Sequence, residues 1–337
     1  MHWSRSSKVL LVLAVTLVLV SAFMLLKREH AAAEFERSAP SVAGSGAIVH
    51  LQTPSRGGAA FRVPRVIWSY WHAERLPPFV AHNAARWRSK LPAFEIRFLS
   101  ERTVRNWIPD FDARAPRGFE QLSKAHQCDW IRLYLLKEHG GVWADASILF
   151  NSEAALQRLC LLAERAHTDL TGFHIDATRT VRAHDRFPIV ENWCFVAADR
   201  ASVAACRPYS LLELWFGEYS NAIAMGFAAY RRHAERALGV DSQKLFNTPG
   251  DTYLTCHLCM QTLLQHTLRA RNLPYPNLYL ERAEDSMFFV QHSMRWVMWF
   301  TGKALLTQRA LRLPYIKLRG LDRSYVKESA LIEHYAL

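Results

Sequence analysis

Residues 123–150, SKAHQCDWIRLYLLKEHGGVWADASILF, constrain the fold of this chain more than any other segment. The segment begins with Ser123, a good helix N-cap residue, and continues with a run rich in Leu, Ile, Trp and Tyr that a pair of glycines ends. Residues 142–144, Val-Trp-Ala, then have the composition of a strand. A helix, a tight glycine turn and a strand in this order are typical of βαβ units, so we expect an α/β fold.

A single carboxylate, Asp145, interrupts the apolar run directly after this strand. Open α/β sheets bind ligands in the crevice at the carboxyl ends of their strands. Ser147 lies two positions further on, and side chains two apart on an extended chain project to the same face. Asp145 and Ser147 could therefore hold one ligand together; the alternative is an ordinary strand end.

Asp129 and Arg132 lie three positions apart in the predicted helix and therefore reach from one of its faces. That face leads into the turn before Asp145. A nucleotide sugar needs a carboxylate for its hydroxyl groups, a cation for its phosphates, and a Mg²⁺ or Mn²⁺ ion on the diphosphate, which one or two protein oxygens can help to hold. The alternative is an ion pair on the helix surface, worth only a few tenths of a kcal/mol.

Further elements alternate in type along the chain. Apolar and alternating patterns predict strands at residues 65–69, 94–99, 170–175 and 193–197. Helices are predicted at residues 80–88, 100–107, 211–219 and 251–269. The final third is rich in aromatic residues, which we interpret as core or as the wall of an acceptor cleft.

The N-terminal region has a different character. Residues 9–26 form an uncharged apolar run between basic flanks, at the lower end of what spans a bilayer as a helix. A cleaved signal peptide is the competing interpretation, but the run is long for one and has no small-x-small exit. We expect a tail at residues 1–8, a transmembrane signal-anchor at 9–26, a flexible stalk at 27–60 and one folded domain at 61–337.

Composition narrows the function classes. The net charge is +12, but Lys and Arg are scattered without runs, so no nucleic-acid partner is expected. The pair Cys256 and Cys259 has no second pair at zinc-site spacing, and buried thiols are the favoured interpretation of the six cysteines. The chain has no GxSxG, GxxxxGK[ST] or GxGxxG motif at a fitting position, which weakens hydrolase, NTPase and dehydrogenase interpretations.

Four ordered segments resemble a known family. SKAHQCDWIRLYLLKEHGGVWADAS resembles the signature of glycosyltransferases with the DXD sugar-binding region and, more closely, that of the capsular polysaccharide synthesis protein family. PRVIWSYWHAERLPP, FPIVENWCFVAA and LPYIKLRG resemble the family's opening, central and C-terminal blocks, so the resemblance covers about residues 62–323. It implies a GT-A-like, Rossmann-type mixed sheet flanked by helices, which the transmembrane helix predicted from residues 9–26 would precede.

The resemblance also implies roles for individual residues. Asp129 and Arg132 match residues that hold the donor sugar and ribose, and Trp71 falls where the family places an aromatic near the nucleotide base. Asp145 matches the first Asp of DXD, with a catalytic, cofactor-binding and metal-binding role. Ser147 stands where DXD has its second Asp, commonly the direct metal ligand, so the implied Mn²⁺ or Mg²⁺ would have a weaker, neutral ligand.

Two further roles are open. Glu191, in Glu191-Asn192-Trp193, could act as the general base on the attacking hydroxyl, or could be a strand-entry residue bonded to backbone. An additional acidic or imidazole metal ligand could come from Glu284, Asp285 or His292.

These features predict a glycosyltransferase of the hexosyltransferase class. Its donor would be a nucleoside diphosphate sugar and its acceptor a glycan or glycolipid; the alternative is a non-catalytic, membrane-anchored nucleotide- or glycan-binding relative. We expect a single-pass type II protein of the Golgi membrane with a luminal domain, although the chain has no N-x-S/T sequon with a permitted middle residue. The alternative is the bacterial inner membrane with a cytoplasmic domain.

Overall fold

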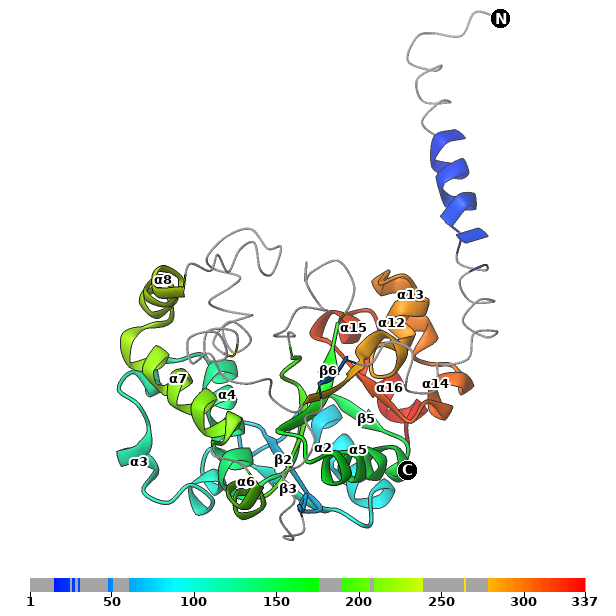
Figure 1. Ribbon diagram of the computed structural model, residues 1–337. Helices are drawn as coiled ribbons and strands as arrows, with labels where there is room; N and C mark the ends of the chain where they lie inside the picture. The colour runs from blue at the N-terminus through cyan, green and yellow to red at the C-terminus, as the bar shows by residue number, and fades with distance from the viewer. Residues whose placement is uncertain are drawn as a thin grey trace, which may run out of the picture.

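The computed structural model describes residues 15–24, 26–27, 30, 48–50, 61–175, 190–206, 209–238, 264 and 278–336. Figure 1 shows the arrangement of its elements. The strands are β1 Ile48–His50, β2 Val66–Tyr70, β3 Glu95–Leu99, β4 Gly141–Ala144, β5 Ile148–Phe150, β6 Leu170–His174, β7 Cys194–Ala197, β8 Leu278–Arg282 and β9 Tyr315–Lys317. The α-helices are α2 Pro78–Lys90, α3 Phe111–Arg114, α4 Lys124–His139, α5 Glu153–Ala166, α6 Arg200–Cys206, α7 Leu211–Met225, α8 Phe227–Leu238, α12 Phe289–Ser293, α13 Met298–Ala304, α14 Gln308–Arg312, α15 Gly320–Ser324 and α16 Glu328–His334. Three 3-10 helices are η1 Thr103–Asn106, η2 Phe119–Gln121 and η3 Ala283–Asp285.

Seven strands form one mixed sheet in the order β1-β8-β6-β7-β4-β2-β3, and β5 pairs with β9 in a separate two-stranded sheet. β2 is parallel to β3 and to β4, and β6 is parallel to β8. β7 lies antiparallel between β4 and β6, and β1 lies antiparallel to β8. The predicted mixed α/β architecture is confirmed. Because β2 and β4 run in parallel, their carboxyl ends meet at the same edge of the sheet.

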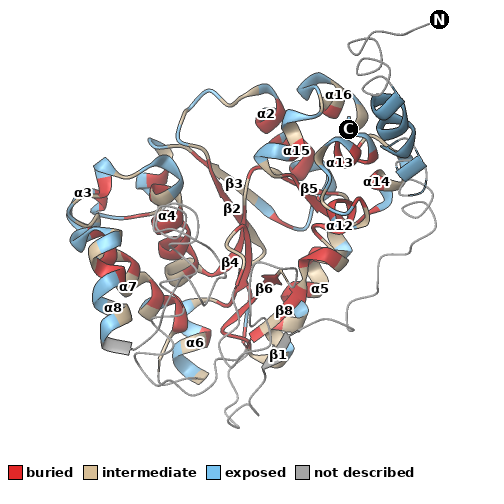
Figure 2. Ribbon diagram, turned by 90° about the horizontal axis from the view of Figure 1, so that it is seen from above, coloured by how far each residue is buried: buried red, intermediate tan, exposed pale blue. Residues whose placement is uncertain are grey.

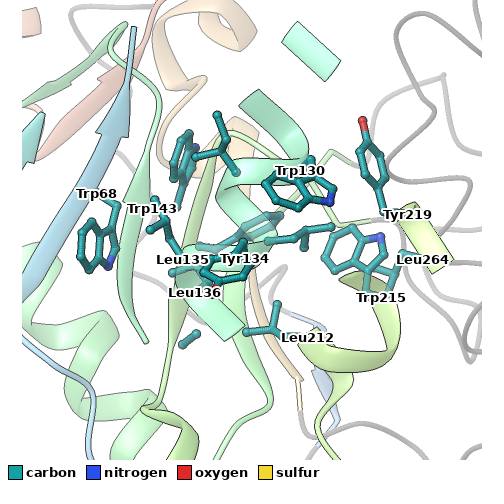
Figure 3. Packing of buried hydrophobic residues seen from close by; sticks show 14 of the residues in the cluster. Trp68, Trp130, Tyr134, Leu135, Leu136, Trp143, Leu212, Trp215, Tyr219 and Leu264 are labelled. Atoms are coloured by element: carbon teal, nitrogen blue, oxygen red, sulfur yellow. The ribbon is translucent and has the colours of Figure 1, made fainter. Parts of the chain in front are cut away.

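The two faces of the sheet carry different helices. Figure 2 shows α3, α4, α7 and α8 on one side of the sheet, and α2, α5 and α12 to α16 on the other. Successive side chains of a strand point to opposite faces, so Trp143 of β4 packs with α4 and α7 while its neighbour Val142 packs with α2 and α5. Figure 3 shows Trp143 in one cluster with Trp130 and Tyr134 of α4, and Trp215 of α7 lies at the opposite end of this cluster from Trp68. This aromatic packing fixes α4 against the sheet.

The link between α4 and β4 requires glycine. Ser123 begins the helix, and its Oγ accepts a hydrogen bond of 3.3 Å from the backbone N of His126, as the sequence predicts. Gly140 and Gly141 have φ angles of 64° and 94°. A Cβ atom at Gly140 would lie 2.6 Å from the carbonyl oxygen of Ala198, and one at Gly141 would lie 2.7 Å from that of Val66. Only glycine therefore lets the strand start directly after the helix.

Two local predictions are wrong. Residues 100–107 form only the short helix η1. At its start the backbone N of Thr103 donates to Ser100 Oγ at 3.3 Å. Pro109 follows closely and restricts the residue before it, so a longer helix does not continue. Asp145 to Ser147 is a turn and not an extended chain, because the backbone N of Ile148 donates to the carbonyl oxygen of Asp145 at 3.0 Å.

Some predictions fall outside the described residues. The predicted helix at 251–269, with Cys256 and Cys259, is described only at Leu264. Among the described cysteines, Cys160 and Cys194 are free and buried as expected, whereas Cys128 and Cys206 are free but only partly buried. The predicted span at 9–26 is described as helix from residue 15 to residue 24 and at 26, and its other residues are outside the description. Within the residues described, no helix has both the length and the apolar character needed to cross a bilayer.

Candidate functional site

A pocket of about 430 Å³ lies where β2 and β4 end, beside the first half of α4. β2 leads into Trp71 and β4 leads into Asp145, while α4 contributes Asp129 and Arg132 from its sheet-facing side. All four line the same pocket, together with Ser147. The residues that sequence reasoning assigned to one ligand site therefore share one hollow.

Arg132 is the centre of the polar network at the pocket floor. Its side chain is only 4% exposed, and its guanidinium donates to Asp129 Oδ1 and, at 2.9 Å, to Asp145 Oδ1. The guanidinium carbon also lies 4.8 Å from the centre of the Trp143 ring. Burial by itself would lower the pKa of Arg132, but the charges of Asp129 and Asp145 outweigh it and raise the pKa above its usual value. Arg132 is therefore a permanent buried cation, and the alternative interpretation, an ion pair on the helix surface, is wrong because the pair is internal.

Asp129 is held from three sides. Besides Arg132, Asn192 Nδ2 donates to its Oδ1 at 3.3 Å and the Tyr219 hydroxyl donates to its Oδ2 at 3.4 Å. Burial raises the pKa of the Asp129 carboxyl group, and the charge of Arg132 opposes this shift. The carboxylate is thus fixed in place by α4, α7 and the loop before β7.

Asp145 is bonded to two cations. Lys317 Nζ donates to its Oδ2 at 2.7 Å, on the opposite carboxylate oxygen from Arg132, and Trp143 Nε1 donates to Oδ1 at 3.1 Å. Burial would raise the pKa of Asp145, but the positive charges of Lys317 and Arg132 outweigh it, and the pKa is lowered. Asp145 is therefore a carboxylate at neutral pH, with 27% of its side chain exposed.

Lys317 is one of the site residues that sequence reasoning missed. Its Nζ also donates to Ser147 Oγ at 2.9 Å, so the ammonium group lies between Asp145 and Ser147. The pairing of β5 with β9 brings it there, since Ile148 is in register with Lys317 and the backbone N of Leu318 donates to the carbonyl oxygen of Ser147 at 3.1 Å. The segment LPYIKLRG, which contains Lys317, resembles the C-terminal block of the family, but nothing in the segment identified Asp145 as the partner of the lysine.

The walls of the pocket combine aromatic and basic side chains. Trp71 lies beside His72, with ring centres 5.7 Å apart, and its backbone N donates to the carbonyl oxygen of Leu99. Basic side chains from two elements line the pocket as well: Lys124 and His126 from α4, and Arg323 from α15. The arrangement offers a flat apolar ring at one side and positive charge for an anionic group.

Other predicted site residues lie elsewhere. Glu191 is not among the residues that line the pocket, and its Oε2 accepts a hydrogen bond of 3.0 Å from Trp193 Nε1, while its neighbour Asn192 does line the pocket. Of the three residues considered as an additional metal ligand, Glu284 and Asp285 lie within 4 Å of Arg282, and His292 is exposed on α12. None of these three lines the pocket.

The donors around Asp145 do not fit the predicted divalent metal ion in this arrangement. Mg²⁺ and Mn²⁺ require several oxygen ligands, and here one carboxylate has both oxygens bonded to cations and the neighbouring hydroxyl bonds to the same ammonium group. In the part of the chain that the structure describes, no three His, Cys, Asp or Glu side chains gather in a way that could hold a metal ion.

Comparison with known proteins supports the resemblance seen in the sequence. The family model of capsular polysaccharide synthesis proteins matches residues 52–201, which confirms the predicted family resemblance over this region. The matched region contains Trp71, Asp129, Arg132, Asp145 and Ser147, whereas Lys317 lies beyond it. None of the curated proteins matches the chain significantly.

Proposed function

We propose that the chain is a glycosyltransferase of polysaccharide biosynthesis that moves a sugar from a nucleoside diphosphate sugar to a hydroxyl group of a glycan or glycolipid. The observation that carries the proposal is that Asp129, Arg132 and Asp145 meet on the floor of one pocket. The match to the capsular polysaccharide synthesis family supports a transferase role in polysaccharide assembly.

In this proposal each side chain has a defined task. Trp71 stacks on the nucleotide base, and the pocket's basic residues Lys124 and Arg323 face the diphosphate. Asp129 and Asp145 accept hydrogen bonds from hydroxyl groups of the sugar and ribose, and Arg132 holds both carboxylates in position. Preorganised charge of this kind stabilises the diphosphate as negative charge gathers on it.

The transfer itself forms one bond and breaks one bond. The acceptor oxygen bonds to the anomeric carbon, the bond from that carbon to the diphosphate oxygen breaks, and the diphosphate leaves with the electron pair. The proton of the acceptor hydroxyl passes to a base or to water. Glu191 remains the predicted base; it does not line the pocket, but Asn192, the next residue, does.

The proposal extends to the fold type of the domain and to its membrane anchor. We assign the domain to the GT-A type, because the mixed sheet carries Asp145 at the end of β4, next to the parallel strand β2. The apolar run at residues 9–26 would anchor the domain, as a type II protein of the Golgi membrane or in the bacterial inner membrane. Extraction of the full chain from membranes by alkaline carbonate, with protease protection of the domain, tests the anchor and its orientation.

The direct test is a donor screen with the full-length chain. Purified protein is incubated with a panel of UDP-, GDP- and dTDP-sugars, and release of the nucleoside diphosphate is measured with and without candidate acceptors. Asp145→Asn is expected to reduce release by about a hundredfold or more, because it removes the charge at the reacting end of the pocket. Asp112→Asn, a change of the same kind at an exposed carboxylate of α3, is the control and should keep full activity.

Two outcomes would refute the proposal in different ways. Full turnover by the Asp145→Asn variant would show that the pocket is not the reaction site. Nucleotide binding without turnover of any donor would favour the alternative, a non-catalytic binding relative.

A further inference from the structure

The ammonium group of Lys317 lies between Asp145 and Ser147, where a divalent cation bound by these two residues would lie. Its Nζ lies 2.7 Å from Asp145 Oδ2 and 2.9 Å from Ser147 Oγ, the two atoms that sequence resemblance assigns to a metal ion. We propose that Lys317 replaces the metal ion, so that the pocket binds a nucleoside diphosphate without a divalent cation. This inference rests on the proposed function, because it assigns to Lys317, which bonds to the pocket residues Asp145 and Ser147, the positive charge that the diphosphate requires.

The backbone holds Lys317 in place on both sides. Its N donates to the carbonyl oxygen of Met287 at 2.9 Å, and its carbonyl oxygen accepts from Gln291 Nε2 at 2.8 Å. Gln291 is itself buried and also donates to Asp322 Oδ2 at 2.9 Å. With only 10% of the side chain exposed, the lysine is directed to one position instead of moving through solvent.

The charges around Asp145 already balance without a metal ion. Two carboxylates, Asp129 and Asp145, face two buried cations, Arg132 and Lys317. A divalent ion between Asp145 and Ser147 would have to displace an ammonium group and remain close to a second cation, and both steps oppose its binding. A lysine is a compact point charge that suits phosphate oxygens.

The first experiment measures binding of UDP, GDP, ADP and dTDP to the full-length wild-type chain by calorimetry, in EDTA and in Mn²⁺. At least one nucleotide is expected to bind in EDTA, with an affinity that Mn²⁺ changes by less than about twofold. Electron paramagnetic resonance of the nucleotide complex should detect no tightly bound Mn²⁺. Binding that needs Mn²⁺, or a tightly bound Mn²⁺ in the wild-type complex, would overturn the inference while leaving the proposed function intact.

The second experiment removes the charge and keeps the stem, in Lys317→Met. In EDTA this variant is expected to lose about tenfold or more in nucleotide affinity, and Mn²⁺ should restore most of the loss, because Asp145 Oδ2 and Ser147 Oγ are then open to a metal ion. Lys317→Arg, which keeps a positive charge, should retain binding in EDTA.

Lys137→Met is the matched control, since the Lys137 side chain is also 10% exposed and also pairs with a carboxylate, at the far end of α4. It should bind nucleotide like the wild type and gain no response to Mn²⁺. Unchanged binding by Lys317→Met in EDTA would overturn the inference. Failure of every nucleotide to bind under all conditions would overturn both the inference and the proposed function. If Lys317→Met does not fold, the wild-type measurements and Lys317→Arg still decide.

Discussion

Two carboxylates of this protein, Asp145 and Glu281, depend on side chains of the same short strand, β9. Lys317 donates to Asp145 Oδ2 at 2.7 Å, and Tyr315, two residues earlier, donates to Glu281 Oε2 at 2.8 Å. Each carboxylate also bonds to one arginine, Arg132 at Asp145 and Arg158 at Glu281. The chemistry of the two clusters is similar, but only Asp145 lines the pocket.

The difference lies in what each cluster leaves exposed. The Glu281 side chain is 5% exposed and its partner Arg158 is 40% exposed, so the carboxylate is enclosed while the cation reaches water. At Asp145 the carboxylate is more exposed than its cations: the side chain of Asp145 is 27% exposed, whereas that of Arg132 is 4% exposed and that of Lys317 is 10% exposed. The Glu281 cluster joins α5, β8 and β9, which is a structural task. The Asp145 cluster presents a carboxylate to a ligand, so a buried ion pair indicates a binding site only where a pocket reaches it.

The largest expected effect comes from Arg132→Met, which leaves the buried Asp129 without its cation and leaves Asp145 paired with Lys317 alone. We expect the free energy of unfolding to fall by about 3–5 kcal/mol, because an uncompensated buried charge is costly. Arg158→Met also leaves a buried carboxylate, Glu281, without its cation, but the Tyr315 hydroxyl still donates to Glu281 and water reaches the position of Arg158, so we expect a smaller loss of about 1–3 kcal/mol. Urea unfolding of the two variants measures both values, and equal losses would contradict the contrast drawn between the clusters.

Much of the Asp145 site could be predicted because its determinants are local. The N-cap Ser123, the apolar run of α4 and the paired glycines lie within one stretch of sequence, and they bring Asp129 and Arg132 to the end of β4. Helix propensity and turn chemistry act over a few residues, so a single sequence reveals them. The composition of residues 142–144 likewise indicated the strand β4.

Lys317 could not be predicted in the same way. It lies 172 positions from Asp145, and the contact depends on the pairing of β5 with β9, two strands of three residues each. The helices α12 to α16 have five to seven residues, too short for a helical period to show in the sequence. The turn at Asp145 was also missed, because an apolar residue between two polar ones reads as a strand.

A smaller effect is expected from Glu281→Gln, which keeps the shape of the side chain but removes its charge. The buried amide can still accept the Tyr315 hydroxyl, and we expect the free energy of unfolding to fall by about 1–3 kcal/mol. Nucleotide affinity per folded molecule should stay unchanged, because Glu281 does not line the pocket. Asp145→Asn should show the converse pattern, with the larger change in binding and turnover. A loss of nucleotide binding in folded Glu281→Gln would show that the two clusters are not independent.

The smallest expected effect is that the two clusters lose their contributions to stability in different pH ranges. The charges of Lys317 and Arg132 hold the pKa of Asp145 below its usual range despite burial, so its contribution to stability is complete above the unfolded value of about 3.9 and is lost as pH falls through the lower folded value. Burial and the charge of Glu281 raise the pKa of Tyr315 well above its usual value. Its contribution is therefore complete below the unfolded value of about 10 and is lost as pH rises toward the folded value.

Urea unfolding of the wild type at a series of pH values, compared with Asp145→Asn and Tyr315→Phe, tests this separation. Asp145→Asn should flatten only the acid limb of the stability curve, because its amide has no proton to gain. Tyr315→Phe should flatten only the alkaline limb, since the ring then has no proton to lose. Between about pH 5 and pH 9 neither group titrates, and the difference between each variant and the wild type should be constant there. A variant that altered both limbs would mean that β9 transmits charge changes from one cluster to the other, so that Lys317 and Tyr315 act as one unit.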